Sequence, residues 1–230
     1  MISRNETRQA LHAAIPIILG YIAIGIPCGI LESSIGMNVV QVLTLSLLFY
    51  SGAGQFMIPN MWIAGSPMAS IILSVSLVNT RQMLYSASLA PKCEKAGKGL
   101  SFLFAATVTD ESFGVNMARF EAGEWSVARA TAVNLMSLSS WTISNVVGVL
   151  IGNAVDIPLA IAAFAMTSIF ICLLVTQKLT LPNVVAALCA IAGVFVCKLV
   201  GLSGPAILIG ALIGVAAGML AAHVLRRRSR

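Results

Sequence analysis

The sequence predicts an all-α, polytopic membrane protein with about eight apolar helical segments. Of its 230 residues, 58% are hydrophobic and only 10% are charged, and the mean hydropathy is +0.95. Soluble domains carry roughly 25% charged residues, so this chain has too few to coat a water-soluble body. Apolar stretches of about 17–25 residues, the length that crosses a bilayer, recur along the whole chain. We expect one transmembrane domain over residues 1–230, because no polar connection is long enough to fold alone.

Turn-forming residues separate these apolar stretches. Gly36 and Asn38 follow the first stretch, Gly65 and Pro67 precede the third, and further Gly, Pro and Asn pairs mark the later boundaries. The predicted helical segments are 13–31, 39–58, 67–90, 100–118, 129–151, 158–176, 181–200 and 204–225.

Positive charge indicates how the chain is oriented. Residues 1–12 carry Arg4 and Arg8, and residues 226–230 read RRRSR. Because cytoplasmic ends of membrane proteins are enriched in Lys and Arg, we expect both termini in the cytoplasm. No small-residue cleavage site follows the first apolar stretch, so we interpret it as a retained helix and not as a signal peptide.

Two topologies place both termini inside. In the first, all eight segments cross the membrane. In the second, segments 39–58 and 100–118 are re-entrant or broken and leave on the side from which they entered. Only the second brings Lys92, Lys95 and Lys98 to the cytoplasmic side, as the charge bias favours. Both segments also carry polar interruptions, which the membrane tolerates only inside protein or along a water-filled cavity.

Several functional classes are excluded by what the chain lacks. The net charge of +6 comes from residues at helix ends and termini, so we expect no nucleic-acid partner. The two histidines, His12 and His223, lie at opposite ends of the chain, the five cysteines form no CxxC pair, and no nucleophile motif occurs. We therefore predict that the protein is not an enzyme and has no metal site and no cofactor.

Three charged residues interrupt apolar segments. Arg81 lies within 67–90, and Asp110 and Glu111 lie within 100–118. Ionisable residues inside a membrane are costly, so each is a candidate functional residue. Adjacent helical residues point about 100° apart, so Arg81 is expected to serve one carboxylate more easily than both. The set is either a structural ion pair or a transport site in which a free carboxyl binds a ligand ammonium or carries a proton.

Other conspicuous residues have simpler interpretations. Glu32 and Lys198 fall near predicted helix ends, where a charged side chain can extend to the interface. Small residues recur on single helix faces and allow close packing between helices. On the last helix, the alternative is a docking face for a second subunit. These small residues are Gly25, Gly29, Gly148, Gly152, Gly210, Gly214, Gly218 and Ala222.

The stretch SGAGQ at residues 51–55 interrupts the second segment. Each glycine in a helix interior costs about 1 kcal/mol relative to alanine, so Gly52 and Gly54 loosen the helix. An unwound stretch exposes backbone groups that can bind an amino acid's carboxylate and ammonium, as in the broken helices of secondary transporters. The alternative is close helix packing.

Four motifs of the first half resemble the AzlC family in order and spacing. They are GYIAIGIPCGIL (20–31), FYSGAGQF (49–56), NTRQMLYSASL (79–89) and TDESFG (109–114). The resemblance implies the large subunit of a branched-chain amino-acid exporter in the bacterial inner membrane, working with a small AzlD-like membrane subunit. Expected substrates are Leu, Ile, Val and in some cases Met. The chain departs from the family pattern at Ala23-Ile24, at Thr80 and at Gln82.

The residues and the resemblance together predict a secondary transporter subunit that exports branched-chain amino acids, coupled to protons. The expected substrate-binding residues are Ser51, Gly52, Gly54, Gln55, Asn79, Arg81 and Tyr85. Asp110 and Glu111 are the expected proton-coupling residues. The alternatives are a passive channel for a small solute and a scaffold subunit whose partner forms the pathway.

Overall fold

The computed structural model describes residues 3–123, 125–155, 179–201 and 206–228, and between 155 and 179 only 157–158, 160–161, 164–165, 167–168, 171 and 175. Throughout these residues the elements are helices. The predicted segment 158–176 lies largely outside the described residues, as do Lys178 and the last two residues of the basic C-terminus.

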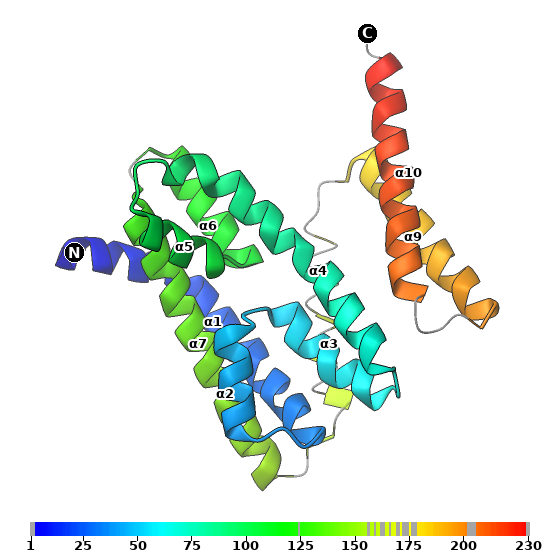
Figure 1. Cartoon of the computed structure of the whole chain (residues 1–230), viewed down its shortest axis with the longest axis horizontal. Helices are drawn as coiled ribbons and strands as arrows, with labels where there is room; N and C mark the ends of the chain where they lie inside the picture. The colour runs from blue at the N-terminus through cyan, green and yellow to red at the C-terminus, as the bar shows by residue number, and fades with distance from the viewer. Residues whose placement is uncertain are drawn as a thin grey trace. The chain divides into compact units, whose positions relative to one another are not determined.

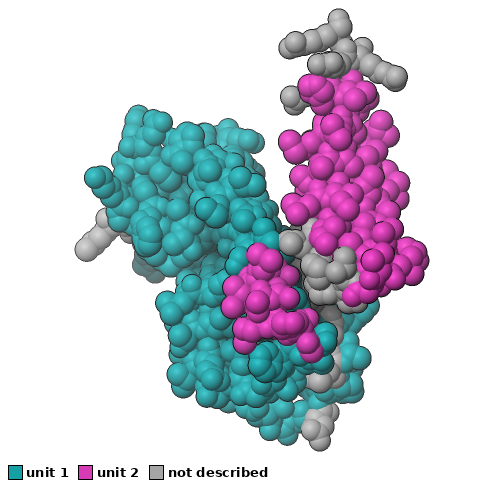
Figure 2. Space-filling model, turned by 45° about the vertical axis from the view of Figure 1, so that its right-hand side comes forward, with its two compact units in different colours: residues 1–64, 75–168 teal, residues 65–74, 169–230 magenta. Residues whose placement is uncertain are grey.

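The chain forms two compact units (Figure 2). The first comprises residues 1–64 and 75–168, and the second comprises residues 65–74 and 169–230. The first unit is built on two long helices that pack along one another, α1 (Arg4–Ser34) and α7 (Val127–Ala154) (Figure 1). A capping box between Ser3 and Glu6 starts α1, so much of the predicted N-terminal tail is helical.

Glycine faces bring α1 and α7 into close contact. A Cβ atom at Gly29 would overlap the backbone carbonyl of Asn145, and one at Gly148 would overlap the carbonyl of Ile26. Gly25 and Gly152 face the opposite helix in the same way. These four small residues therefore serve internal packing, which was the simpler of the two interpretations.

Two predicted membrane segments are broken into pairs of short helices. The first pair is α2 (Val39–Leu48) and α3 (Gly52–Ile63), and the second is α5 (Lys98–Ala106) and α6 (Asp110–Glu121). Each break has three residues, 49–51 and 107–109, and the chain changes direction there (Figure 1). At 1.5 Å per residue, the longest of the four helices reaches only about 18 Å, whereas the bilayer core is about 30 Å thick.

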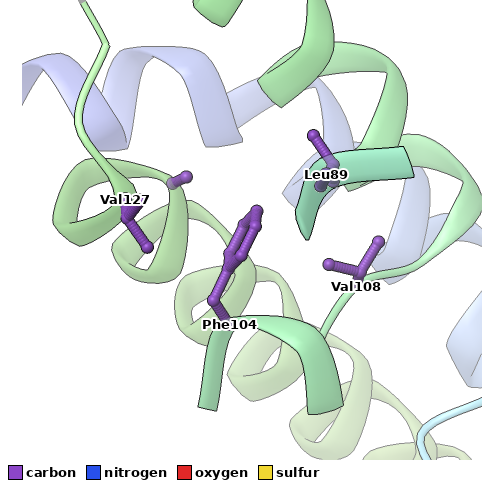
Figure 3. Packing of buried hydrophobic residues seen from close by; sticks show 5 residues of the cluster. Leu89, Phe104, Val108 and Val127 are labelled. Atoms are coloured by element: carbon purple, nitrogen blue, oxygen red, sulfur yellow. The ribbon is translucent and has the colours of Figure 1, made fainter. Parts of the chain in front are cut away.

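The packing around α4 (Met68–Leu89) and the 3-10 turn η1 (Ala90–Cys93) bears on the choice between the two topologies. Leu89 at the end of α4 and Val127 at the start of α7 belong to one buried cluster, completed by Phe104, Val108 and Ala130 (Figure 3). If all segments crossed, Leu89 and Val127 would lie on opposite membrane faces, about 30 Å apart. Their place in one cluster favours the topology in which both broken segments turn back.

The start of α7 also lies beside the start of α1. Arg129 Nε donates to Glu6 Oε1 at 3.2 Å, so the two long helices run in the same direction. The end of α4, the start of α7 and the start of α1 therefore lie at the same end of the first unit, next to the basic loop after α4. This is the end that the charge bias assigns to the cytoplasm.

Polarity in the first unit is inverted relative to a soluble protein. Buried positions include many polar side chains, while large apolar side chains such as Leu19, Leu48 and Ile143 face outward. Such a surface suits a lipid environment. The buried polar residues are Glu32, Ser46, Ser51, Gln55, Thr107, Thr109, Ser112, Asn116, Thr131, Asn134, Ser137, Thr142, Ser144 and Asn145.

The second unit contains the helix pair α9 (Leu181–Leu199) and α10 (Ala206–Arg228). Gly210, Gly214 and Gly218 of α10 approach Ala186, Ala190 and Val194 of α9 closely. The small face of the last helix is thus covered by α9, and its interpretation as a docking face for another subunit is wrong.

Three described helices, α1, α7 and α9, are long and apolar enough to cross a membrane, and α2 and the stretch 209–225 are shorter apolar helices. The protein is therefore an all-α membrane protein. The predicted number of eight segments is not reproduced among the described residues.

Candidate functional site

The two helix breaks are built alike. Ser51 caps α3 and accepts a hydrogen bond from Gly54 N at 3.1 Å, and Thr109 caps α6 and accepts from Ser112 N at 3.4 Å. Hydroxyl caps of this kind satisfy one of the free N–H groups at a helix start. The positive ends of two half-helices are thereby fixed inside the first unit.

The strongest polar contact at the breaks is an ion pair between α4 and α6. Arg81 Nη2 lies 2.8 Å from Asp110 Oδ2, and the two side chains are 28% and 19% exposed. Arg81 Nε and Asp110 Oδ1 are buried and have no hydrogen-bond partner among the described residues. The pair thus retains one donor and one acceptor for a third group.

Glu111 is held separately from this pair. Tyr21 of α1 donates from its hydroxyl to Glu111 Oε2 at 2.7 Å, and the same hydroxyl lies 2.8 Å from Thr109 Oγ1. The Glu111 residue itself is exposed, whereas Tyr21 is buried. Arg81 therefore pairs with one of two adjacent carboxylates, as the helical geometry predicted.

Tyr21 also links the two breaks. Its ring meets Tyr50, in the first break, edge-on at 6.4 Å between centroids, and meets Trp141 of α7 at 5.3 Å. Since its hydroxyl contacts the second break, both breaks converge on this single side chain of α1. Sequence analysis had not selected Tyr21, although it lies in the first of the four motifs.

One face of α4 contacts both breaks. Ser51 Oγ donates to Asn79 Oδ1 at 2.6 Å, and Gln82 Nε2 donates to the carbonyl of Tyr50 at 3.2 Å. Tyr85 stacks on Phe113 of α6 with centroids 4.6 Å apart. Asn79, Arg81 and Tyr85, which were predicted to act together, are therefore gathered at the breaks.

The glycine stretch differs from the prediction. The chain is non-helical only up to Ser51, and Gly52, Gly54 and Gln55 form the first turn of α3. Gly52 lies against the Trp141 ring, and the Gly54 N–H is used by Ser51. In the first turn of a helix, the N–H groups of Gly52 and Ala53 have no partner within the helix.

Gln55 is placed away from Arg81, in a second buried network. Its Nε2 donates to Glu32 Oε1 and to Ser46 Oγ, both at 3.0 Å, and its Oε1 accepts from Trp141 Nε1 at 2.6 Å. The amide is thus occupied by protein groups. Glu32 is fully buried, so the expectation that it extends to the interface is wrong.

The second break is supported by asparagines that sequence analysis did not select. Asn134 Nδ2 donates to the carbonyl of Phe104 at 3.2 Å and to Thr107 Oγ1 at 3.3 Å. Asn116 Nδ2 donates to Asn134 Oδ1 at 2.9 Å, and Trp125 Nε1 donates to Asn116 Oδ1 at 3.1 Å. An amide inside an apolar helix was the signal that could have identified them.

The described part of the chain offers no cluster of three or more His, Cys, Asp or Glu side chains suited to a metal ion. Its cysteines, Cys28, Cys93, Cys189 and Cys197, are free, and Cys172 lies outside the described residues.

The family model for AzlC protein matches residues 16–155, which include every candidate site residue. The chain is 27% identical to the branched-chain amino acid transport protein AzlC of Bacillus subtilis strain 168 over 214 residues, covering 90% of this chain and 82% of the relative. It is 28% identical to the inner membrane protein YgaZ of Escherichia coli K12 over 191 residues, covering 79% and 78%. An uncharacterized membrane protein of Helicobacter pylori J99 is 29% identical over 171 residues, covering 74% and 75%. No solved structure matches the chain.

Proposed function

Because the chain belongs to the AzlC family of membrane transport proteins, we propose that it is the large subunit of a branched-chain amino-acid exporter in the bacterial inner membrane. Its substrates are leucine, isoleucine and valine, with methionine as a further candidate, and it works with a small AzlD-like membrane subunit. The observation that supports this most is the Arg81–Asp110 ion pair at the junction of two broken helices.

Arg81 binds the substrate carboxylate. Its Nε has no partner among the described residues, so a carboxylate can be held while Asp110 keeps the guanidinium in place through Nη2. The N–H groups of Gly52 and Ala53 lie at the positive end of α3, where an anion is stabilised. Ser51 and Asn79 hold that helix start against α4, and Gln55 and Gly54 maintain its shape.

Glu111 exchanges a proton for the substrate ammonium, and Asp110 contributes to the same charge balance. The proton and the substrate ammonium compete for the Glu111 carboxylate. The transporter therefore carries the amino acid outward without a proton and returns with a proton but no amino acid. This competition drives amino acids outward while protons move inward. Tyr85 and Phe113 present a stacked aromatic surface beside the pair, which suits an apolar substrate side chain.

The test is amino-acid uptake, driven by an imposed pH gradient, into proteoliposomes that contain the chain and its small partner. We expect the transport of leucine and valine to be lost in the double variant Asp110→Asn, Glu111→Gln. Transport that is unaffected by both changes would remove the proton role. Leucine flux that saturates with the partner alone would assign the pathway to the partner and make this chain a scaffold.

A further inference from the structure

Glu32 is a buried carboxyl that the transport mechanism above does not use. It lies in the last turns of α1 and is fully buried. Oε1 accepts the hydrogen bond from Gln55, but Oε2 has no hydrogen-bond partner among the described residues. No described cation forms an ion pair with it. An ionised carboxylate in such a place is costly, whereas a protonated carboxyl carries no charge to bury.

The helices around Glu32 offer nothing that would neutralise it. Neither α2 nor α3 contains a titratable residue, and the single one in α7 is Arg129, in the first turn, where it pairs with Glu6. On α1 itself, the nearest titratable group is the thiol of Cys28, one turn away and buried. The phenols of Tyr21 and Tyr50 belong to a chain of ring contacts in which Tyr21 meets both Trp141 and Tyr50.

The side-chain amide of Gln55 has only one orientation that satisfies its hydrogen-bond partners. An indole N–H can donate but cannot accept, so the oxygen of Gln55 must face Trp141 and its NH₂ group must face Glu32 and Ser46. Gln55 therefore ties α3 to α1, α2 and α7 at once. When Glu32 is ionised, its charge strengthens one of these hydrogen bonds, because charge-assisted hydrogen bonds are roughly twice as strong as neutral ones.

We propose that Glu32 is a second proton-binding site of the protein, and that a proton on its Oε2 loosens the hold of α1 on the broken helix pair α2–α3. The site would signal proton binding to the first break through Gln55, while Glu111 acts at the second break. The role in transport rests on the function proposed above, but proton binding by Glu32 does not.

Trp141 provides a direct readout, since its indole is hydrogen-bonded to the amide that Glu32 holds. In a Trp62→Phe, Trp125→Phe background, Trp141 is the sole tryptophan. Its emission is measured without substrate while the pH is varied between about 5 and about 9, around the range where a buried carboxyl titrates. We expect a one-proton transition that Glu32→Gln removes and Glu111→Gln leaves in place.

Glu32→Asp keeps a carboxyl but shortens it, so the transition should persist with a smaller amplitude. If Glu32→Gln fails to fold, as judged by its helical circular dichroism, Glu32→Asp still tests the proposal that Glu32 binds a proton. An unchanged transition in Glu32→Gln, a transition of full amplitude in Glu32→Asp, or a flat emission with Glu32 present would each overturn the proposal. Because no substrate is present, the result is independent of amino-acid transport. If the protein without substitutions at Glu32 or Glu111 shows no amino-acid exchange in vesicles but keeps the Trp141 transition, only the transport function is contradicted.

Discussion

Arg81 of α4 and Asp110 of α6 form a 2.8 Å ion pair at the point where two interrupted membrane helices meet. The pair is anchored from both sides. Asn79 and Gln82, on the same helix as Arg81, bond to the first break, while Asp110 is the first residue after the second. The separation of Arg81 and Asp110 therefore reports the relative position of the two breaks. Any movement of the breaks during transport must stretch this pair.

The first prediction concerns this ion pair. Arg81→Gln leaves Asp110 partly buried without its cation, and we expect a destabilisation of about 2 kcal/mol, the range for a lost hydrogen bond to a charged group. Adding Asp110→Asn should restore most of the stability but not leucine exchange, because the carboxylate-binding donor is gone. Thermal unfolding in detergent and vesicle exchange measure the two effects. Arg8→Gln, at an exposed position in α1, is the control and should change neither. Full exchange in the double variant would show that the pair is only structural.

The second prediction concerns Tyr21, whose hydroxyl donates to Glu111. Tyr21→Phe removes this hydrogen bond, which holds the Glu111 side chain beside the second break. We expect a smaller maximal rate of leucine transport in vesicles. Tyr50→Phe is the matched control, because the Tyr50 hydroxyl has no hydrogen-bond partner in the described structure. Equal transport rates for both variants would show that the hydrogen bond from Tyr21 to Glu111 has no role in transport.

The third prediction concerns the packing of α1 against α7. Gly29→Ala and Gly148→Ala each place a methyl group against a backbone carbonyl of the opposite helix, and overpacking of this kind costs about 1–3 kcal/mol. Gly20→Ala lies on the same helix α1 with open space around it and should be neutral or slightly stabilising. The thermal midpoints of the purified variants in detergent test this difference. Equal midpoints for Gly20→Ala and Gly29→Ala would contradict the close contact.

The fourth prediction concerns topology. Because the end of α4 packs beside the start of α7, we expect the loop that carries Lys92, Lys95 and Lys98 to lie on the membrane face from which α1 enters. In a cysteine-free background, Lys95→Cys should react with an impermeant thiol reagent from the cytoplasmic side alone, as should a cysteine at Arg4. Labelling of position 95 only from outside would restore the topology with eight plain crossings.

The sequence was sufficient for the helical membrane class and for the breaks in segments 39–58 and 100–118, because composition and polar interruptions are local properties. It also indicated that Arg81 serves one carboxylate more easily than both, because adjacent helical residues point about 100° apart. It could not decide between the two topologies, because charge bias alone left both open. What favours one of them is the buried cluster that Leu89 and Val127, 38 positions apart, share in the folded chain.

Glu32 and Gln55 show where local interpretation fails. Each was assigned from its position in its own segment: Glu32 to the interface because it ends a helix, and Gln55 to the ligand because it follows two glycines. Their hydrogen bond joins residues 23 positions apart, and no periodicity within either segment indicates it. Tyr21 was missed for the same reason, because its partner Glu111 lies 90 positions away.

Coupled proton movement tests the central claim most directly. Proteoliposomes holding the chain and its small partner are loaded with leucine and a pH-sensitive dye, and are then diluted into leucine-free buffer. If leucine and protons compete for Glu111 beside the Arg81–Asp110 pair, the vesicle interior should acidify as leucine leaves, and Glu111→Gln should abolish this signal. Leucine efflux with no change in internal pH, or with alkalinisation, would contradict the account.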